Sequence, residues 1–260
     1  MSAAASPAWR WVAECAVGVL HRDSGLSCQD RAVVDLCHDG EDRCTALVAA
    51  VADGAGSALE GEQGAQLATT AALRVLKCAA AACGTPAQAM DLVREAFAVA
   101  RADIIESSQQ QGIEVREFST TLLVALVTPA FACFGQIGDG AIVFGDADGL
   151  ALAFACEQEM VNVTDFVTDD SALDRLRMHC VERRVERLAM MSDGLMPLFV
   201  ARRDQSPHGP AFVQLFSTLL ESADDAALPE QLRGFLQSEV VNARTDDDKS
   251  LVLAVREPSA

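Results

Sequence analysis

The chain has 260 residues, and half of them are apolar, so it is long enough to bury the core of one large domain. Its formal net charge of -18 at pH 7 argues against nucleic acid or an anionic membrane as a partner, because both bind basic surfaces. The same charge is compatible with cation binding. The first residues lack the charged start and apolar core of a signal peptide, which predicts a cytoplasmic location.

The first half of the chain predicts strands followed by two long helices. Short apolar runs predict strands over residues 11–20, 31–37 and 44–52. The composition then changes to Ala, Leu and Gln, which favour helix, and this change predicts helices over residues 60–82 and 87–111. Thr85 and Pro86 are the residue types preferred as the cap and the first helical position of the second helix.

Strands return in the second half, where two hairpins are predicted, one over residues 119–127 and 130–137 and one over 141–145 and 150–155. The polar segment 157–184 indicates only a short helix over 171–179. A strand then leads into Asp193, helices follow over 210–221 and 229–242, and residues 250–255 form the last strand. With no repeat and no linker, we expect a single domain over residues 1–260. The order of strands and helices predicts an α+β fold with helices packed outside antiparallel sheets.

Nine cysteines are spread along the chain. They form no C-x-x-C pair, their number is odd, and most lie inside apolar runs, so we expect small buried hydrophobic residues in a reducing cytosol rather than disulfides or a zinc site. They are Cys15, Cys28, Cys37, Cys44, Cys78, Cys83, Cys133, Cys156 and Cys180.

Four acidic motifs from distant parts of the chain stand at the ends of predicted strands. They are Asp53-Gly54, Gly138-Asp139-Gly140, Ser192-Asp193-Gly194 and Asp246-Asp247-Asp248. A carboxylate at the end of a buried strand is held in position and still meets solvent. Oxygen ligands of this kind suit Mg²⁺ or Mn²⁺, so the pattern favours one shared metal site.

A single Asp-Gly pair is ordinarily only a turn. Four acidic motifs at strand ends, with Asp30 as a fifth acidic position, are less easily explained by turns alone, and crowded carboxylates without a cation would repel each other. The segment that starts at Asp146 does not match a calcium-binding loop, because Leu150 occupies a ligand position and Ala151 replaces the required glycine. We therefore expect a hairpin turn there. Among the histidines His21 is the best candidate for acid–base chemistry, and no covalent nucleophile has an evident base partner.

Six motifs in order resemble the metal-dependent protein phosphatases of the 2C type (the PPM family), and in particular their bacterial branch. The similarity runs from about His21 to Val255. The motifs are Cys28-Gln29-Asp30-Arg31, Val51-Ala52-Asp53-Gly54-Ala55-Gly56, Ser119-Thr120-Thr121-Leu122, Gly138-Asp139-Gly140, Ser192-Asp193-Gly194-Leu195 and Asp247-Asp248-Lys249-Ser250.

The resemblance implies a four-layer αββα sandwich and a metal-activated water that hydrolyses phosphoserine or phosphothreonine in proteins. Asp53 would bridge two Mn²⁺ or Mg²⁺ ions, with the Gly54 carbonyl, Asp193 and Asp247 as further ligands. Asp139 would hold a third, weaker ion. Asp30 would orient the attacking water, and Thr120 and Thr121 would support the site. A phosphoprotein substrate and an opposing Ser/Thr kinase are the implied partners.

Two departures from the family pattern concern the substrate. No arginine stands a few residues before Gln29, so we expect His21 or Arg22 to bind the phosphate instead. Ala55 stands where eukaryotic members often carry a histidine that protonates the leaving group. The segment 157–184 corresponds to the family's mobile flap. Two alternatives stay open, a phosphatase-like binding or sensor module without turnover and a hydrolase of small phosphoesters.

Overall fold

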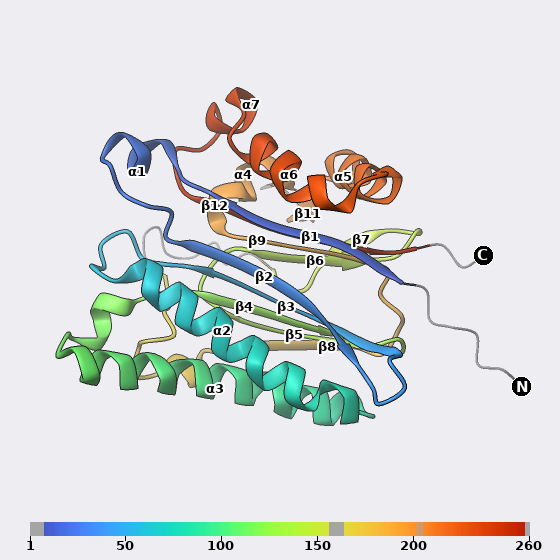
Figure 1. The fold of residues 1–260 in the computed structure, drawn as a ribbon, viewed down its shortest axis with the longest axis horizontal. Coiled ribbons are helices and arrows are strands. Elements are labelled where there is room, and N and C mark those ends of the chain that lie inside the picture. Colours follow the sequence, from blue (N-terminus) through green and yellow to red (C-terminus); the bar gives the residue numbers. More distant parts are fainter. Residues whose placement is uncertain (1–7, 156–163, 202, 204, 258–260) are drawn as a thin grey trace, which may run out of the picture.

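The computed structural model describes residues 8–155, 164–201, 203 and 205–257, and it shows two antiparallel five-stranded sheets packed face to face (Figure 1). Helices cover the outer face of each sheet, so the layers run helix, sheet, sheet, helix. This arrangement confirms the predicted α+β fold and the αββα sandwich. No helix among the described residues is long and apolar enough to cross a membrane.

Each sheet combines strands from both halves of the chain. Sheet A has the order β1 (Trp9–Ala16), β12 (Lys249–Arg256), β9 (Arg187–Met191), β6 (Ala141–Gly145) and β7 (Leu150–Leu152). Sheet B has the order β2 (Asp30–His38), β3 (Cys44–Asp53), β4 (Leu122–Val127), β5 (Ala132–Ile137) and β8 (Arg177–Val181). The chain crosses from sheet B to sheet A between β5 and β6, at the Gly138-Asp139-Gly140 motif.

Two long helices, α2 (Gly61–Ala79) and α3 (Pro86–Gln111), cover sheet B, and α5 (Gly209–Glu221) and α6 (Leu228–Leu236) cover sheet A (Figure 1). The start of α3 confirms the predicted cap, because the Thr85 side chain accepts from the Gln88 N–H and Pro86 opens the helix. Three short helices complete the described set. They are α1 (Val19–Asp23), α4 (Met196–Phe199) and α7 (Glu239–Asn242).

The core has three parts, one beneath each pair of helices and one between the sheets. Alanines on α2 let this helix lie close to sheet B. At Gly64 the same helix meets the 3-10 turn Val115–Phe118 so closely that there is no room for a side chain. A Cβ on Gly64 would stand 2.1 Å from the carbonyl oxygen of Phe118. Strands β3 and β5 are buried between layers, so their ends are fixed in position, and the motifs of Asp53 and Asp139 follow those ends. The motifs of Asp193 and Asp247 stand at the ends of β9 and β12 in sheet A.

Several boundaries differ from the sequence predictions. Residues 171–179 were expected to be helical, but a single 3-10 turn (Ala172–Asp174) leads into β8, which pairs with β5. Pairing with an open sheet edge outweighs the local preference of this polar segment. The expected helix over 229–242 divides into α6 and α7, because Ser238 caps a new helix by accepting from the Val241 N–H. The expected first strand over residues 11–20 ends at Ala16, and α1 follows.

The structure also corrects the expectation for the cysteines. Cys133 and Cys180 stand directly opposite each other on β5 and β8 and form a disulfide. The pairing of β8, which the sequence did not predict, is what brings them together. Cys37 is buried as expected, but Cys78 on α2 is exposed. Cys156 lies outside the described residues. The predicted hairpin turn at residues 146–149 is confirmed, with the Asp146 N–H donating to the Gly149 carbonyl at 3.2 Å.

Candidate active site

The acidic motifs meet at one end of the sandwich. Asp30 opens β2 and stands opposite Asp53 at the end of β3. In sheet A, Met191 pairs with both Ala141 and Leu251, so the segments just beyond these residues, which carry Asp139, Asp193 and Asp247, lie at the same end of that sheet. Strand register therefore explains how carboxylates from five segments come together.

The Asp53 backbone is held by the segment just before β4. Its carbonyl accepts from the Thr120 hydroxyl at 3.0 Å and from the Thr121 N–H at 2.9 Å, and its own N–H donates to the Thr121 hydroxyl at 3.0 Å. The next residue, Gly54, packs against the start of α2, where a Cβ would stand 2.4 Å from the backbone of Gly61. The predicted support by the two threonines is thus a set of bonds to the Asp53 backbone, which leaves the Asp53 carboxylate for other partners.

Asp30 is buried at the start of β2, with 1% of its surface exposed. The Ser192 hydroxyl donates to its Oδ2 at 2.7 Å, and the Ser250 N–H donates to the same hydroxyl at 3.1 Å. Burial raises the pKa of Asp30 to about 7, and the nearby Asp248 adds to the rise. Its Oδ1 has no hydrogen-bond partner among the described residues.

The remaining carboxylates shift one another's pKa. Burial raises the pKa of Asp53 well above its ordinary value, and Asp30, Asp193 and Asp247 add to this shift. Burial and the charge of Asp139 raise the pKa of Asp193 to about 6. Asp53 and Asp193 are close enough for each to shift the pKa of the other. Such a group of buried acids is costly at neutral pH unless positive charge is added.

A hard divalent cation fits this donor set. Asp193 Oδ1, like Asp30 Oδ1, is buried without a partner among the described residues, so acceptor oxygens are left over. In the described part of the chain no three acidic, histidine or cysteine groups surround one point closely enough to hold an ion by themselves. Mg²⁺ keeps several waters and needs only one or two carboxylates, so pairs such as Asp53 and Asp193 suffice.

Asp139 is exposed at the outer edge of this group, on the crossing between the sheets. Gly138 and Gly140 on either side have φ of 92° and 102°, values that favour glycine and allow the sharp crossing. The Thr164 hydroxyl donates to Asp139 Oδ2 at 3.0 Å, so the described part of the predicted flap meets the site here. Residues 156–163 of that segment lie outside the described residues.

His21 and Arg22, the predicted phosphate-binding residues, lie on α1. His21 Nδ1 stands 2.9 Å from Asp248 Oδ2, and its Nε2 faces the first acidic motif, 3.7 Å from where a Cβ on Gly56 would be. The Arg22 side chain is exposed and pairs with Asp23 at 3.5 Å. The structure therefore places His21 beside the carboxylates, whereas Arg22 points to solvent on the same helix.

Sequence reasoning missed the role of Asp248. This carboxylate is buried and accepts from the Gly18 N–H at 2.6 Å and the Gln29 N–H at 2.6 Å, in addition to His21. It ties the segment before β2 to the loop that carries Asp247. Its position next to the predicted ligand Asp247 could have indicated a role for Asp248 in the site. The sequence did not reveal its partners, because they stand 219 or more residues away in the chain.

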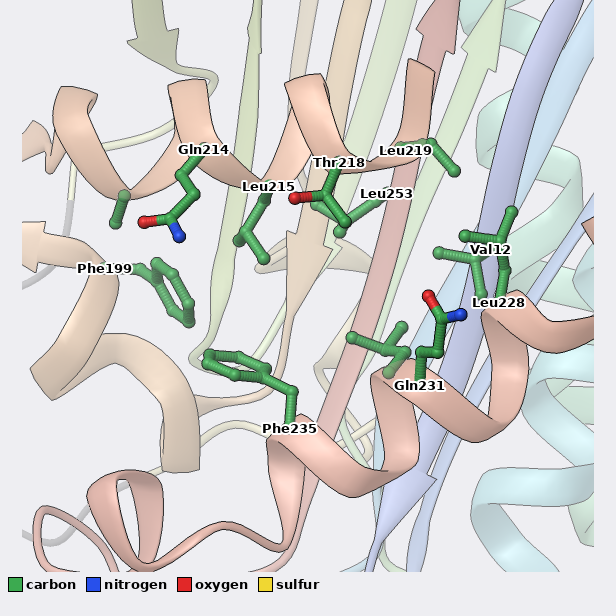
Figure 2. A pocket seen from close by; sticks show the side chains of 12 residues that line it. Val12, Phe199, Gln214, Leu215, Thr218, Leu219, Leu228, Gln231, Phe235 and Leu253 are labelled. Atoms are coloured by element: carbon green, nitrogen blue, oxygen red, sulfur yellow. The ribbon is translucent and has the colours of Figure 1, made fainter. Parts of the chain in front are cut away.

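A cavity of about 280 Å³ lies elsewhere, between α5, α6 and sheet A (Figure 2). Most of its lining is apolar, including Phe199, Leu215 and Phe235, and its polar side chains are Gln214, Thr218 and Gln231. None of the acidic site residues lines it. Amides, a hydroxyl and apolar groups do not supply a metal centre, so the carboxylate cluster is the candidate active site.

Comparison with known proteins agrees with this geometry. Residues 17–237 match the family described as Protein phosphatase 2C. The chain is 33% identical over 250 residues to Serine/threonine-protein phosphatase 3 of Escherichia coli strain K12, with 95% of this chain and 98% of that protein covered. The chain therefore belongs to the protein phosphatase 2C family, whose reaction is the metal-dependent hydrolysis of phosphoserine and phosphothreonine in proteins.

Solved structures of bacterial proteins share the fold. The serine/threonine phosphatase Stp1 of Staphylococcus aureus matches with a TM-score of 0.65 at 15% identity, covering 99% of each chain. PppA of Pseudomonas aeruginosa matches with a TM-score of 0.63 at 18% identity, covering 96% of this chain and 98% of that one.

Proposed function

We propose that this chain hydrolyses phosphoserine and phosphothreonine in proteins with two or three Mn²⁺ or Mg²⁺ ions held by the carboxylate cluster. The observation that carries the proposal is the meeting of Asp30, Asp53, Asp193 and Asp247 at one end of the sandwich, with acceptor oxygens left without partners. Family membership supports the same reaction.

In this proposal Asp53, the Gly54 carbonyl, Asp193 and Asp247 hold the principal ions, and Asp139 holds an additional one. When bound, the cations activate water for attack on phosphorus and neutralise phosphoryl oxygens. Asp30 accepts a hydrogen bond from the attacking water through its Oδ1, which has no partner among the described residues.

His21 and Arg22 stay the proposed contacts for the phosphate group. For His21, the bond from Nδ1 to Asp248 fixes the ring, so Nε2 is the nitrogen presented to the first acidic motif. For Arg22, the partner Asp23 is on the surface, and an exposed pair of this kind is weak enough to exchange for a phosphate. The cytoplasmic location and an opposing kinase stay predictions.

The test uses p-nitrophenyl phosphate and a phosphothreonine peptide, each with and without Mn²⁺, for the wild type and Asp53→Asn. Turnover of both that requires Mn²⁺ and Asp53 supports the proposal. Binding of the peptide without turnover would instead indicate the sensor module, and turnover of the small ester alone would indicate a small-phosphoester hydrolase.

A further inference from the structure

We propose that a pocket beside the active site binds a basic side chain of the substrate, so that the enzyme prefers phosphoproteins with Lys or Arg near the phosphorylated residue. This inference rests on the proposed function. The pocket has a volume of about 240 Å³ and lies between the loop before β2 and the start of α2. Its lining residues are Leu26, Ser27, Gln29, Leu59, Glu60, Glu62, Gln63 and Gln66.

The pocket is joined to the active site through Gln29. The Gln29 carbonyl accepts from the Gly54 N–H at 3.2 Å, and the Gln29 N–H donates to Asp248 at 2.6 Å. On the other wall, Leu59 and Glu60 belong to the loop that follows Asp53-Gly54. A peptide whose phosphate lies at the carboxylates therefore passes this pocket within a few residues, since an extended chain advances about 3.3 Å per residue.

Two leucines form an unusual apolar rim for a surface opening. Leu59 is 79% exposed and Leu26 is 52% exposed, and they come from the two opposite walls. Exposed leucines are unremarkable when scattered singly, but here both line one pocket beside the predicted catalytic residues. They offer contact to the aliphatic part of a long side chain.

The interior of the pocket offers acceptors and negative charge. Glu60 lines it and makes no ion pair within the described residues, while Glu62 is partly balanced by Arg31 at 3.6 Å. The apolar rim and the Glu60 carboxylate together match a Lys or Arg side chain, whose stem is apolar and whose head is positively charged.

The experiment measures kcat/KM for phosphothreonine peptides that carry a single Arg at successive positions around the phosphothreonine. Each is compared with a matched peptide carrying citrulline, which has nearly the shape of Arg and no charge. We expect Arg to be favoured about fivefold at one or two positions, which corresponds to a partly exposed ion pair of about 1 kcal/mol.

Glu60→Lys should lower this Arg-to-citrulline ratio to one or below. Glu95→Lys, the same charge change on the exposed surface of α3, should leave the ratio as in the wild type. Leu59→Ser should lower kcat/KM for the Arg and the citrulline peptide together, because both use the same apolar rim.

A ratio near one at every position in the wild type, or a ratio that Glu60→Lys does not change, would overturn the pocket assignment. If the wild type hydrolyses none of the phosphopeptides, that result would instead contradict the proposed function. Turnover of p-nitrophenyl phosphate by each variant shows that its metal centre is assembled.

Discussion

Asp30 and Asp53 stand directly opposite each other on the antiparallel strands β2 and β3. Asp30 is buried and bonded to Ser192, whereas Asp53 ends its strand at the carboxylate cluster. Two acids in one register pair repel each other when both are charged. The other acidic motifs lie at the same end of the sandwich. The repulsion between Asp30 and Asp53 therefore falls within the site where bound cations would offset it.

The metal-free protein should lose stability as the pH rises, and Asp30 should account for part of that loss. Its pKa in the folded state, about 7, lies above the ordinary 3.8. Its contribution is therefore fully present below about 3.8 and is lost as the pH rises through about 7. In the presence of a chelator, we expect the unfolding free energy of Asp30→Asn to fall less steeply over this range than that of the wild type. Urea unfolding at a series of pH values checks this, and parallel curves would contradict it.

Asp248→Ala should destabilise the fold by about 2–5 kcal/mol. The substitution leaves the buried Gly18 N–H and the partly buried Gln29 N–H without their acceptor, and the loss of a buried partner costs roughly 1–3 kcal/mol. His21→Ala should cost less, because it removes one bond from a partly exposed ring. Chemical unfolding measures both, and equal effects of the two variants would show that the backbone bonds of Asp248 contribute little.

Gly54→Ala should cost about 2–3 kcal/mol, because its Cβ would stand 2.4 Å from the backbone of Gly61. Gly40→Ala is the matched control, since nothing lies within 4 Å of a Cβ there, and its effect should stay within about 0.5 kcal/mol. Thermal or urea unfolding of both variants tests the difference. A Gly54→Ala protein as stable as the control would mean that the turn after β3 is not tightly packed.

Reducing the Cys133–Cys180 disulfide should lower stability without unfolding the protein. The bond closes a loop with a sequence separation of 47, which limits its contribution to about 4 kcal/mol. The strands it joins stay paired through their backbones. Peptide mapping under non-reducing conditions should recover this pair, and unfolding with and without a thiol reductant gives the difference. A peptide map that links either cysteine to another partner would contradict the placement of β8.

The strand-end motifs and the α+β order of strands and helices were accessible from the sequence because both depend on local patterns, whereas the four-layer sandwich was implied by the resemblance to the 2C-type phosphatases. The apolar run before Asp53 and the cap at Thr85 need only a few neighbouring residues to be recognised. What the sequence hid depends on distant contacts. β8 lies in a polar segment and becomes a strand because the edge of β5 is available to it. Its pairing also brings Cys133 and Cys180 together.

The candidate site shows the same division. The aspartates were predicted, because each follows or precedes an apolar strand. The role of Asp248 was not, since it depends on Gly18 coming so near that a Cβ would stand 2.3 Å from the backbone of Asp247. Only the folded chain brings those two segments together.

Titration of the metal-free protein with Mn²⁺ tests the central claim most directly. Calorimetry should show that the wild type binds two ions. Electron paramagnetic resonance should show spin coupling between them, because the two ions lie close together. Asp53→Asn should lose the coupled pair, whereas Asp91→Asn, on the exposed surface of α3, should bind as the wild type does. An Asp53→Asn protein that binds the same number of coupled ions with the same affinity would contradict the claim that these carboxylates share a metal centre.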